Sequence, residues 1–253
     1  MNFPHQKEYY KMKKLDIIPA IDLRNGRCVR LVQGDYDQCT IYDEEPLEIA
    51  QYFESLGIKR LHLVDLDGAA AGEIKNSDTL ELICKETSLE VDFSGGVQTS
   101  QDIDKVLEAG AKYVGIGSVA QRNPEQVKQW FATYGGDQII IGADVWNEKI
   151  AIQGWTVQTD TSLDELIGWY ADELKYLICT DISKDGMLAG PSTNLYKRLI
   201  CDYPQLNIIA SGGVSSLSDI EELNKLGSSG VILGKAIYEN KIDLIELKRW
   251  IEK

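Results

Sequence analysis

The sequence Ser211-Gly212-Gly213-Val214 occurs twice in this chain, because Ser94-Gly95-Gly96-Val97 stands 117 residues earlier. Each copy follows a short apolar run and precedes a segment with a helical pattern. A strand that runs into Ser-Gly-Gly presents several backbone N–H groups at one edge, with no Cβ in the way. One Gly-Gly pair indicates only a tight turn. Two copies at matching places of a repeat instead predict two loops that bind phosphate.

From Leu15 onward, short apolar runs alternate with amphipathic segments. We expect strands at residues 16–22, 60–65, 89–93, 112–116, 138–144, 175–181, 207–210 and 230–233. We expect helices at residues 46–56, 77–87, 100–109, 124–134, 162–172, 192–201, 217–226 and 242–251. Eight βα units in regular alternation predict a closed (β/α)8 TIM barrel, with a doubly wound open sheet as the competitor.

The two halves of the chain also align outside the Ser-Gly-Gly-Val loops. Asp22 pairs with Asp144, and Val64-Asp65 pairs with Thr180-Asp181. The α/β chain therefore reads as two fused half-barrel repeats that form one domain over residues 15–253. Residues 1–14 are polar and basic and are expected to be an N-terminal extension. We expect that deletion of residues 1–11 leaves folding and activity unchanged.

Composition narrows the class of partner. With 40 acidic and 26 basic residues, the net charge of −14 argues against nucleic acid or an anionic membrane as partner. Five scattered cysteines and two histidines argue against a disulfide framework or a metal site. No apolar run approaches the roughly 20 residues of a membrane span. We expect a cytoplasmic monomer that binds phosphate through backbone amides and a few placed cations.

Two aspartates are the candidate catalytic residues. Asp22 and Asp144 each follow an apolar run directly, at the ends of the first and fifth expected strands. In an eight-stranded barrel these strands are opposite, and the carboxyl ends of the strands carry the active site. The two carboxyl groups would therefore face one substrate from two sides, as an acid and a base do. The acid needs a pKa above the ordinary value of about 3.9.

Further candidates follow other strands. The residues expected to bind substrate are Asp65, Thr180, Asp185, Arg30 in the long loop after strand one, and Trp155, which follows Gly154. Solvated loop positions, helix N-caps or a cap over the barrel are the plainer alternatives. His62 has the opposite strand parity to Asp65, so we expect it to face the helices.

Phosphate ligands are expected on two sides of the barrel mouth. One group follows strands three and four: Ser94, Gly95, Gly96, Gly117 and Ser118. The other follows strands seven and eight: Ser211, Gly212, Gly213, Gly234 and Lys235. Two such sites predict a long small-molecule substrate that carries a phosphate at each end.

These motifs resemble a known family. The matching stretches are Ile17-Ile18-Pro19-Ala20-Ile21-Asp22-Leu23, Arg30-Leu31-Val32-Gln33-Gly34-Asp35, Val64-Asp65-Leu66-Asp67-Gly68-Ala69 and residues 181–186. They are similar to the ProFAR isomerases (phosphoribosylformimino-5-aminoimidazole carboxamide ribotide isomerases) of histidine biosynthesis. The resemblance implies a (β/α)8 barrel that converts the aminoaldose ProFAR to the aminoketose PRFAR by an Amadori rearrangement, without cofactor or metal.

The resemblance also implies roles for individual residues. By it, Asp22 is the general base, Asp144 is the general acid, and Thr180 and Asp185 assist around the ribose. The chain departs from the family at Gln98, where an arginine is frequent. Arg122 or an arginine of the loop after strand one could neutralise that phosphate instead.

Two alternatives remain open. One is the cyclase subunit of imidazole glycerol phosphate synthase, although Ala20 and Val29-Arg30-Leu31 differ from its usual first-strand motifs. The other is a non-catalytic barrel that binds a phosphorylated metabolite, although it would not need aspartates on both strand one and strand five. Whether a second isomerase activity exists is also left open.

Overall fold

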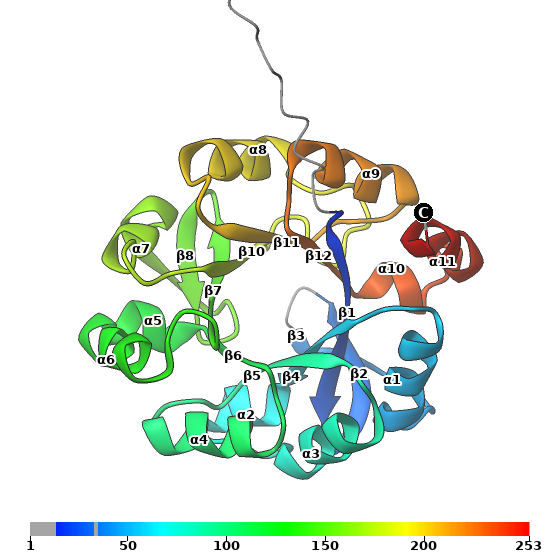
Figure 1. Cartoon of the computed structure of the whole chain (residues 1–253), viewed down its shortest axis with the longest axis horizontal. Coiled ribbons are helices and arrows are strands. Elements are labelled where there is room, and N and C mark those ends of the chain that lie inside the picture. The colour runs from blue at the N-terminus through cyan, green and yellow to red at the C-terminus, as the bar shows by residue number, and fades with distance from the viewer. Residues whose placement is uncertain (1–13, 33–34, 253) are drawn as a thin grey trace, which may run out of the picture.

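Eight parallel strands form a closed barrel in the computed structural model, which describes residues 14–32 and 35–252 (Figure 1). Strand β10 pairs with both β11 and β7, and this second pairing closes the ring. The barrel strands in chain order are β1 (Asp16–Arg24), β4 (Arg60–Asp65), β5 (Glu90–Ser94), β6 (Tyr113–Ile116), β7 (Ile139–Trp146), β10 (Tyr176–Asp181), β11 (Asn207–Ser211) and β12 (Gly230–Leu233). The predicted (β/α)8 barrel is confirmed.

Helices surround the barrel and follow its strands in turn (Figure 1). The main ones are α1 (Pro46–Ser55), α3 (Ser77–Glu86), α4 (Ser100–Glu108), α6 (Pro124–Tyr134), α7 (Leu163–Trp169), α8 (Thr193–Asp202), α9 (Leu217–Leu226) and α11 (Leu244–Glu252). Each expected helix is present and shifts by a few residues at its ends. Among the described residues, we find no helix with the length and apolar character to cross a membrane.

The apolar residues form two separate clusters, because strand side chains alternate in direction. The larger cluster lies between strands and helices and includes Leu23, Leu61 and Leu63. The smaller cluster fills the barrel interior and comprises Ile18, Ala20, Tyr113, Ile140, Ile178, Ile209 and Ile232. Polar side chains therefore gather at the carboxyl-end mouth of the barrel, above this inner plug.

Two β-hairpins extend the barrel and were not expected from the sequence. Strand β1 continues into β2 (Arg27–Val32) and β3 (Asp35–Ile41), and β7 continues into β8 (Lys149–Ile152) and β9 (Val157–Ser162). Asn25-Gly26 and Asn147-Glu148 form the turns, with positive φ at all four residues. This backbone suits tight hairpin turns, and Asn-Gly is a strong sequence signal for one. The hairpins stand at matching places of the repeat.

Three short helices were also unexpected: α2 (Leu66–Ala71), α5 (Ser118–Arg122) and α10 (Lys235–Tyr238). Helices α5 and α10 begin directly after the equivalent strands β6 and β12. Neither has a side-chain cap at its first turn. Their first N–H groups therefore lack a partner from a capping side chain, at the ends of both predicted phosphate loops.

Candidate active site at the carboxyl end of the barrel

Asp22 and Asp144 lie on opposite strands, as predicted. Three strands separate β1 from β7 in either direction around the ring. Asp22 pairs with Val64 of β4, and Asp144 pairs with Thr180 of β10. Both aspartates lie near the carboxyl ends of their strands, where the hairpins begin: Asp22 pairs with Val29 of β2, and Asp144 pairs with Ala151 of β8. The fold therefore points two carboxyl groups into one mouth.

Asp144 has the environment of an acid. Burial raises the pKa of its carboxyl group, and hydrogen bonds from the Trp155 and Thr180 side chains and the charge of His62 oppose that rise only in part. Thr180 is itself buried. A carboxyl group whose pKa is raised holds its proton over a wider pH range, and this is what a general acid requires.

Asp22 has a different environment, because it is paired. Nη1 of Arg30 lies 2.7 Å from Oδ2 of Asp22, and only 14% of each side chain is exposed. Arg30 belongs to β2, so the unexpected hairpin is what places this cation beside the strand-one carboxylate. A charge-assisted pair at this distance fixes the orientation of the candidate base.

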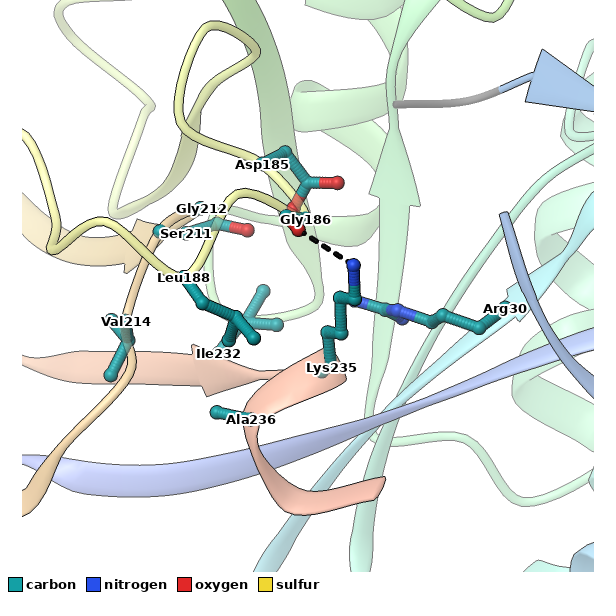
Figure 2. A pocket seen from close by; sticks show the side chains of 12 residues that line it. Arg30, Asp185, Gly186, Leu188, Ser211, Gly212, Val214, Ile232, Lys235 and Ala236 are labelled. Carbon is teal, nitrogen blue, oxygen red and sulfur yellow. Dashed lines mark hydrogen bonds between the residues drawn. The ribbon is translucent and has the colours of Figure 1, made fainter. Parts of the chain in front are cut away.

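A pocket beside this pair is built by the second Ser-Gly-Gly-Val loop (Figure 2). It is lined by Arg30, Asp185, Gly186, Leu188, Ser211, Gly212, Gly213, Val214, Ile232, Gly234, Lys235 and Ala236. Lys235 donates from Nζ to the Gly186 carbonyl at 3.0 Å, shown as the dashed line in Figure 2. The predicted ligands of the second phosphate site are thus brought together with two cations.

Gly234 has a specific steric reason to be glycine. A Cβ atom there would lie 1.6 Å from Nη2 of Arg30. The guanidinium group is therefore seated directly against the backbone at the start of α10. One arginine touches both the candidate base and the second phosphate loop.

The glycine pairs of both loops have the same geometry. Gly95 and Gly212 have φ values of 104° and 93°, in the region that favours glycine. A Cβ on Gly95 would lie 2.2 Å from the Asp65 carbonyl oxygen, and one on Gly212 would lie 2.8 Å from the Asp181 carbonyl oxygen. Each loop is thus pressed against the end of the preceding strand, and this confirms that the repeat extends to backbone conformation.

The main helices that follow these loops are already capped by aspartates. Asp102 accepts from the backbone N–H of Gln98 and Thr99 ahead of α4, at 3.0 and 2.8 Å. Asp219 accepts from those of Ser215 and Ser216 ahead of α9, at 2.8 and 3.0 Å. The two N-termini therefore carry their own negative charge. A phosphate is better placed at the glycines and at the uncapped α5 and α10.

The first-half loop differs from the second in its charges. Ser118 occupies the place of Lys235, and its hydroxyl accepts from the Gln153 N–H at 3.1 Å. The side-chain oxygen of Gln98 accepts from Nη2 of Arg122 at 3.3 Å. Arg122 ends α5, so Gln98 connects this loop to an arginine. Gln98, which stands where the resemblance leads one to expect an arginine, thus contacts another arginine, Arg122.

Asp65 does not face the mouth, which corrects its prediction as a substrate ligand. Its carboxylate is fully buried and accepts from the N–H groups of Gly68, Lys75 and Asn76 and from the Asn76 side chain, at 2.6–2.9 Å. Its strand partner Leu23 also faces the helices. All its acceptor capacity serves the loop after β4, so its role is structural.

The prediction for His62 was wrong for the same reason. His62 pairs with Ala20 of the inner cluster, so its ring faces the barrel interior and not the helices. Its imidazole lies against the Asp92 carboxylate. Val64 and Thr180 occupy equivalent repeat positions, and Thr180 faces Asp144. Parity counted from Thr180 would have placed His62 correctly.

Trp155 and Asp185 complete the mouth. Trp155 has a φ of 70° in the segment between β8 and β9, is half-buried, and hydrogen-bonds to Asp144. Asp185 lines the Arg30 pocket, and burial raises its pKa although Arg30 opposes the rise. Trp146, in contrast, is 44% exposed. Among the described residues, we find no cluster of three or more metal-ligating side chains.

Comparison with known proteins assigns this chain to a family. The family model described as "Histidine biosynthesis protein" matches residues 16–243. That span includes every strand and every candidate residue of the barrel mouth.

The chain belongs to the histidine biosynthesis protein family.

Similar members of the family share one name, 1-(5-phosphoribosyl)-5-((5-phosphoribosylamino)methylideneamino)imidazole-4-carboxamide isomerase. The relative from Flavobacterium psychrophilum is 48% identical over 236 residues, which is 93% of this chain and 98% of the relative. The relative from Parabacteroides distasonis is 50% identical over 237 residues, 93% of this chain and 99% of the relative. The relative from Azobacteroides pseudotrichonymphae has the same identity and coverage.

Proposed function

We propose that this protein is the isomerase of histidine biosynthesis that converts ProFAR to PRFAR by an Amadori rearrangement. The observation that carries the proposal is the placement of Asp22 and Asp144. They end opposite strands of one barrel and lie between two glycine loops of the same geometry. Relatives about half identical to the chain over their full length bear this activity in their names.

Asp144 is proposed as the general acid. Its protonated carboxyl group gives a proton to the ribose ring oxygen, the bond from that oxygen to C1 breaks, and the ring opens to an imine. Its raised pKa keeps this proton available, and Trp155 and Thr180 hold the group in place. Proton transfer by a placed side chain typically contributes 10²–10⁴-fold to a rate.

Asp22 is proposed as the general base. Its carboxylate takes the proton from C2, the electron pair of that bond forms the C1–C2 double bond, and the imine becomes an enolamine. Loss of the hydroxyl proton at C2 and protonation at C1 then give the ketose. Nη1 of Arg30 lies 2.7 Å from Oδ2 of Asp22 and thereby holds the carboxylate in position for the proton abstraction.

The two loops are proposed to bind the two phosphates of the substrate. At one end, the backbone of Gly212, Gly213 and Gly234 approaches the phosphate closely, with Lys235 and Arg30 as cations. At the other end, the phosphate is approached by the backbone of Ser94, Gly95, Gly96, Gly117 and Ser118. There Arg122 replaces the arginine that is frequent at the position of Gln98. Trp155 is proposed to stack on the planar ring of the substrate.

The test is to incubate the purified protein with ProFAR, without ammonia or glutamine, and to follow PRFAR. Turnover supports the isomerase. No turnover of ProFAR, with turnover of PRFAR in the presence of ammonia, would assign the chain to the cyclases. Binding of ProFAR without turnover of either compound would favour a non-catalytic barrel.

A further inference from the structure

A column of charged side chains lies inside the barrel below the proposed catalytic carboxyl groups. Arg60 and His62 are two residues apart on β4, and Asp92 on β5 pairs with His62. The Asp92 side chain has no exposed surface, and 5% of the Arg60 side chain is exposed. The proposed mechanism uses none of these residues. Burial of charged groups to this depth costs free energy unless the groups pair with one another.

The side chains of the column contact one another in series, from His62 through Asp92 to Arg60. Nδ1 of His62 contacts Oδ1 of Asp92. Oδ2 of Asp92 lies 3.8 Å from Nη2 of Arg60, and the guanidinium carbon of Arg60 lies 4.8 Å from the centroid of the Tyr113 ring. Arg60 also lies 3.6 Å from Asp16 at the amino end of β1. The column thus connects the floor of the barrel to His62.

Within the described residues, the hydrogen bonding of this column is incomplete at one place. Oδ2 of Asp92 and Nε and Nη2 of Arg60 have no hydrogen-bond partner. The imidazole of His62 is therefore the group that satisfies the Asp92 carboxylate by a direct hydrogen bond. A side chain without a hydrogen-bond donor there would leave Asp92 dependent on an arginine beyond hydrogen-bond distance.

His62 is also placed to act upward, toward the mouth. His62 pairs with Ala20 of β1. Asp22 is the next residue of β1 on the same face, so Asp22 lies one layer of side chains above His62. The methyl group of Ala20 leaves the ring uncovered on that side, and 14% of the His62 side chain is exposed. The carboxylates that act on His62 are Asp92 from β5, Asp22 from β1 and Asp144 from β7.

We propose that Asp92 and Arg60 are positioning residues that hold His62 as an imidazolium beneath Asp22 and Asp144. Asp92 fixes the ring by accepting from Nδ1, and Arg60 lies 3.8 Å from the other oxygen of Asp92. The remaining N–H of His62 then presents a positive charge to the two carboxyl groups from below, opposite to Arg30. This charge favours the carboxylate that Asp22 needs before it takes the C2 proton.

The electrostatic direction agrees with this arrangement. Burial disfavours the charged ring, yet the carboxylates of Asp92, Asp22 and Asp144 together outweigh burial, and the pKa of His62 is raised. The inference rests on the proposed function, because His62 serves the same site. Its first test therefore measures protonation and needs no turnover.

The chain has two histidines, so NMR can follow each of them separately. The variant His5→Gln assigns the two imidazole signals, and His5 serves as the reference in the other proteins. We expect His62 of the wild type to titrate above the ordinary pKa of about 6.5. Asp92→Asn should lower that value, because it removes the carboxylate that contacts Nδ1 of the ring. A wild-type value below 6.5, or the same value in Asp92→Asn, would overturn the proposal.

Kinetics supply the second test. Asp92→Asn should lower kcat about 10- to 100-fold with KM little changed, less than the 10²–10⁴-fold expected for loss of an acid or base itself. The alkaline limb of the pH–rate profile, which reports Asp144, should move to higher pH, since the charge of His62 lowers the pKa of that carboxyl group. Ile209→Val, a packing change in the same barrel interior, is the control and should keep both. An unchanged limb in Asp92→Asn would refute the positioning role even if the isomerase activity is confirmed.

Discussion

Arg30 joins the two functional parts of the barrel mouth, because its guanidinium group lies 2.7 Å from the Asp22 carboxylate and packs against the backbone of Gly234. Asp22 lies near the end of β1 in the first half, and Gly234 directly follows β12 in the second half. A substrate phosphate held near Gly234 is thereby connected through one side chain to the carboxylate proposed as the base.

Replacement of Arg30 should therefore affect both binding and chemistry. Arg30→Met should raise KM and lower kcat, so that kcat/KM falls about 10- to 100-fold, as expected for loss of a charged hydrogen bond worth about 1.5–3 kcal/mol. Steady-state kinetics with ProFAR measures it. The control is Arg27→Met, an exposed arginine of the same hairpin, which should behave as wild type. A change in KM alone would show that the pair with Asp22 has no part in catalysis.

The pH profile should respond to the hydrogen bonds on Asp144. The Thr180 and Trp155 side chains both lower the pKa of this carboxyl group, so Thr180→Val and Trp155→Phe should raise it. An acid works in its protonated form, and activity is lost as the pH rises through its pKa. The alkaline limb that reports Asp144 should therefore move to higher pH in both variants. Movement of this limb only in Asp185→Asn would transfer the acid role to Asp185, whose pKa is also raised.

Asp144 should reduce stability at neutral pH. Burial raises its pKa in the folded state, so its contribution to stability is fully present below the unfolded pKa and is lost as pH rises through the folded value. Asp144→Asn should thus unfold at a higher temperature than wild type at pH 7, by about 2–4 °C for each kcal/mol gained. The difference should vanish near pH 4, and calorimetry across pH measures it. The same variant should lose most of its activity, about 10²–10⁴-fold.

Glycine at position 95 should be essential for folding. Gly95→Ala combines a φ of 104° with a Cβ atom 2.2 Å from the Asp65 carbonyl oxygen. We expect a loss of stability of about 1–3 kcal/mol or more. Urea denaturation is the measurement, with Gly117→Ala as the control, since a Cβ there meets no atom within 4 Å and φ is −96°. Equal stabilities for the two variants would contradict the packing of this loop on β4.

Arg122 should matter for binding more than for chemistry. Arg122→Met should raise KM about threefold to tenfold with kcat unchanged, as expected for one exposed hydrogen-bonding cation worth about 0.5–1.5 kcal/mol. The effect should shrink at high salt. Lys128→Met removes an exposed cation of the neighbouring helix α6 and should leave KM as it was. If the two variants behave alike, Arg122 does not contact the substrate.

The strand and helix pattern was predictable, because buried strands and amphipathic helices leave periodic apolar residues. Asp22 and Asp144 were predictable for a related reason, since each interrupts an apolar run at its end. The hairpin after β7 was missed because β8 is only four residues long and β9 is mostly exposed and polar. Asn25-Gly26 was the available signal for the first hairpin.

Side-chain direction was the least predictable feature. Asp65 and His62 were assigned to the wrong faces of β4, because an aspartate at a strand end was expected to face the mouth. Asp65 instead turns outward, where backbone N–H groups of the following loop satisfy it. Asp92 was overlooked because a single polar residue inside an apolar run does not indicate which residue of another strand it pairs with.

The charges around the two glycine loops differ, although their backbones match. Lys235 stands where the first half has Ser118, and Arg122 stands where the second half has Glu239, which lies 3.5 Å from Lys235. A barrel with two identical halves would accept a molecule with two phosphates in either direction, and half of all encounters would place the wrong carbon before Asp22. If the two loops bind the two phosphates as proposed, the unequal cations favour one orientation of the substrate in the mouth.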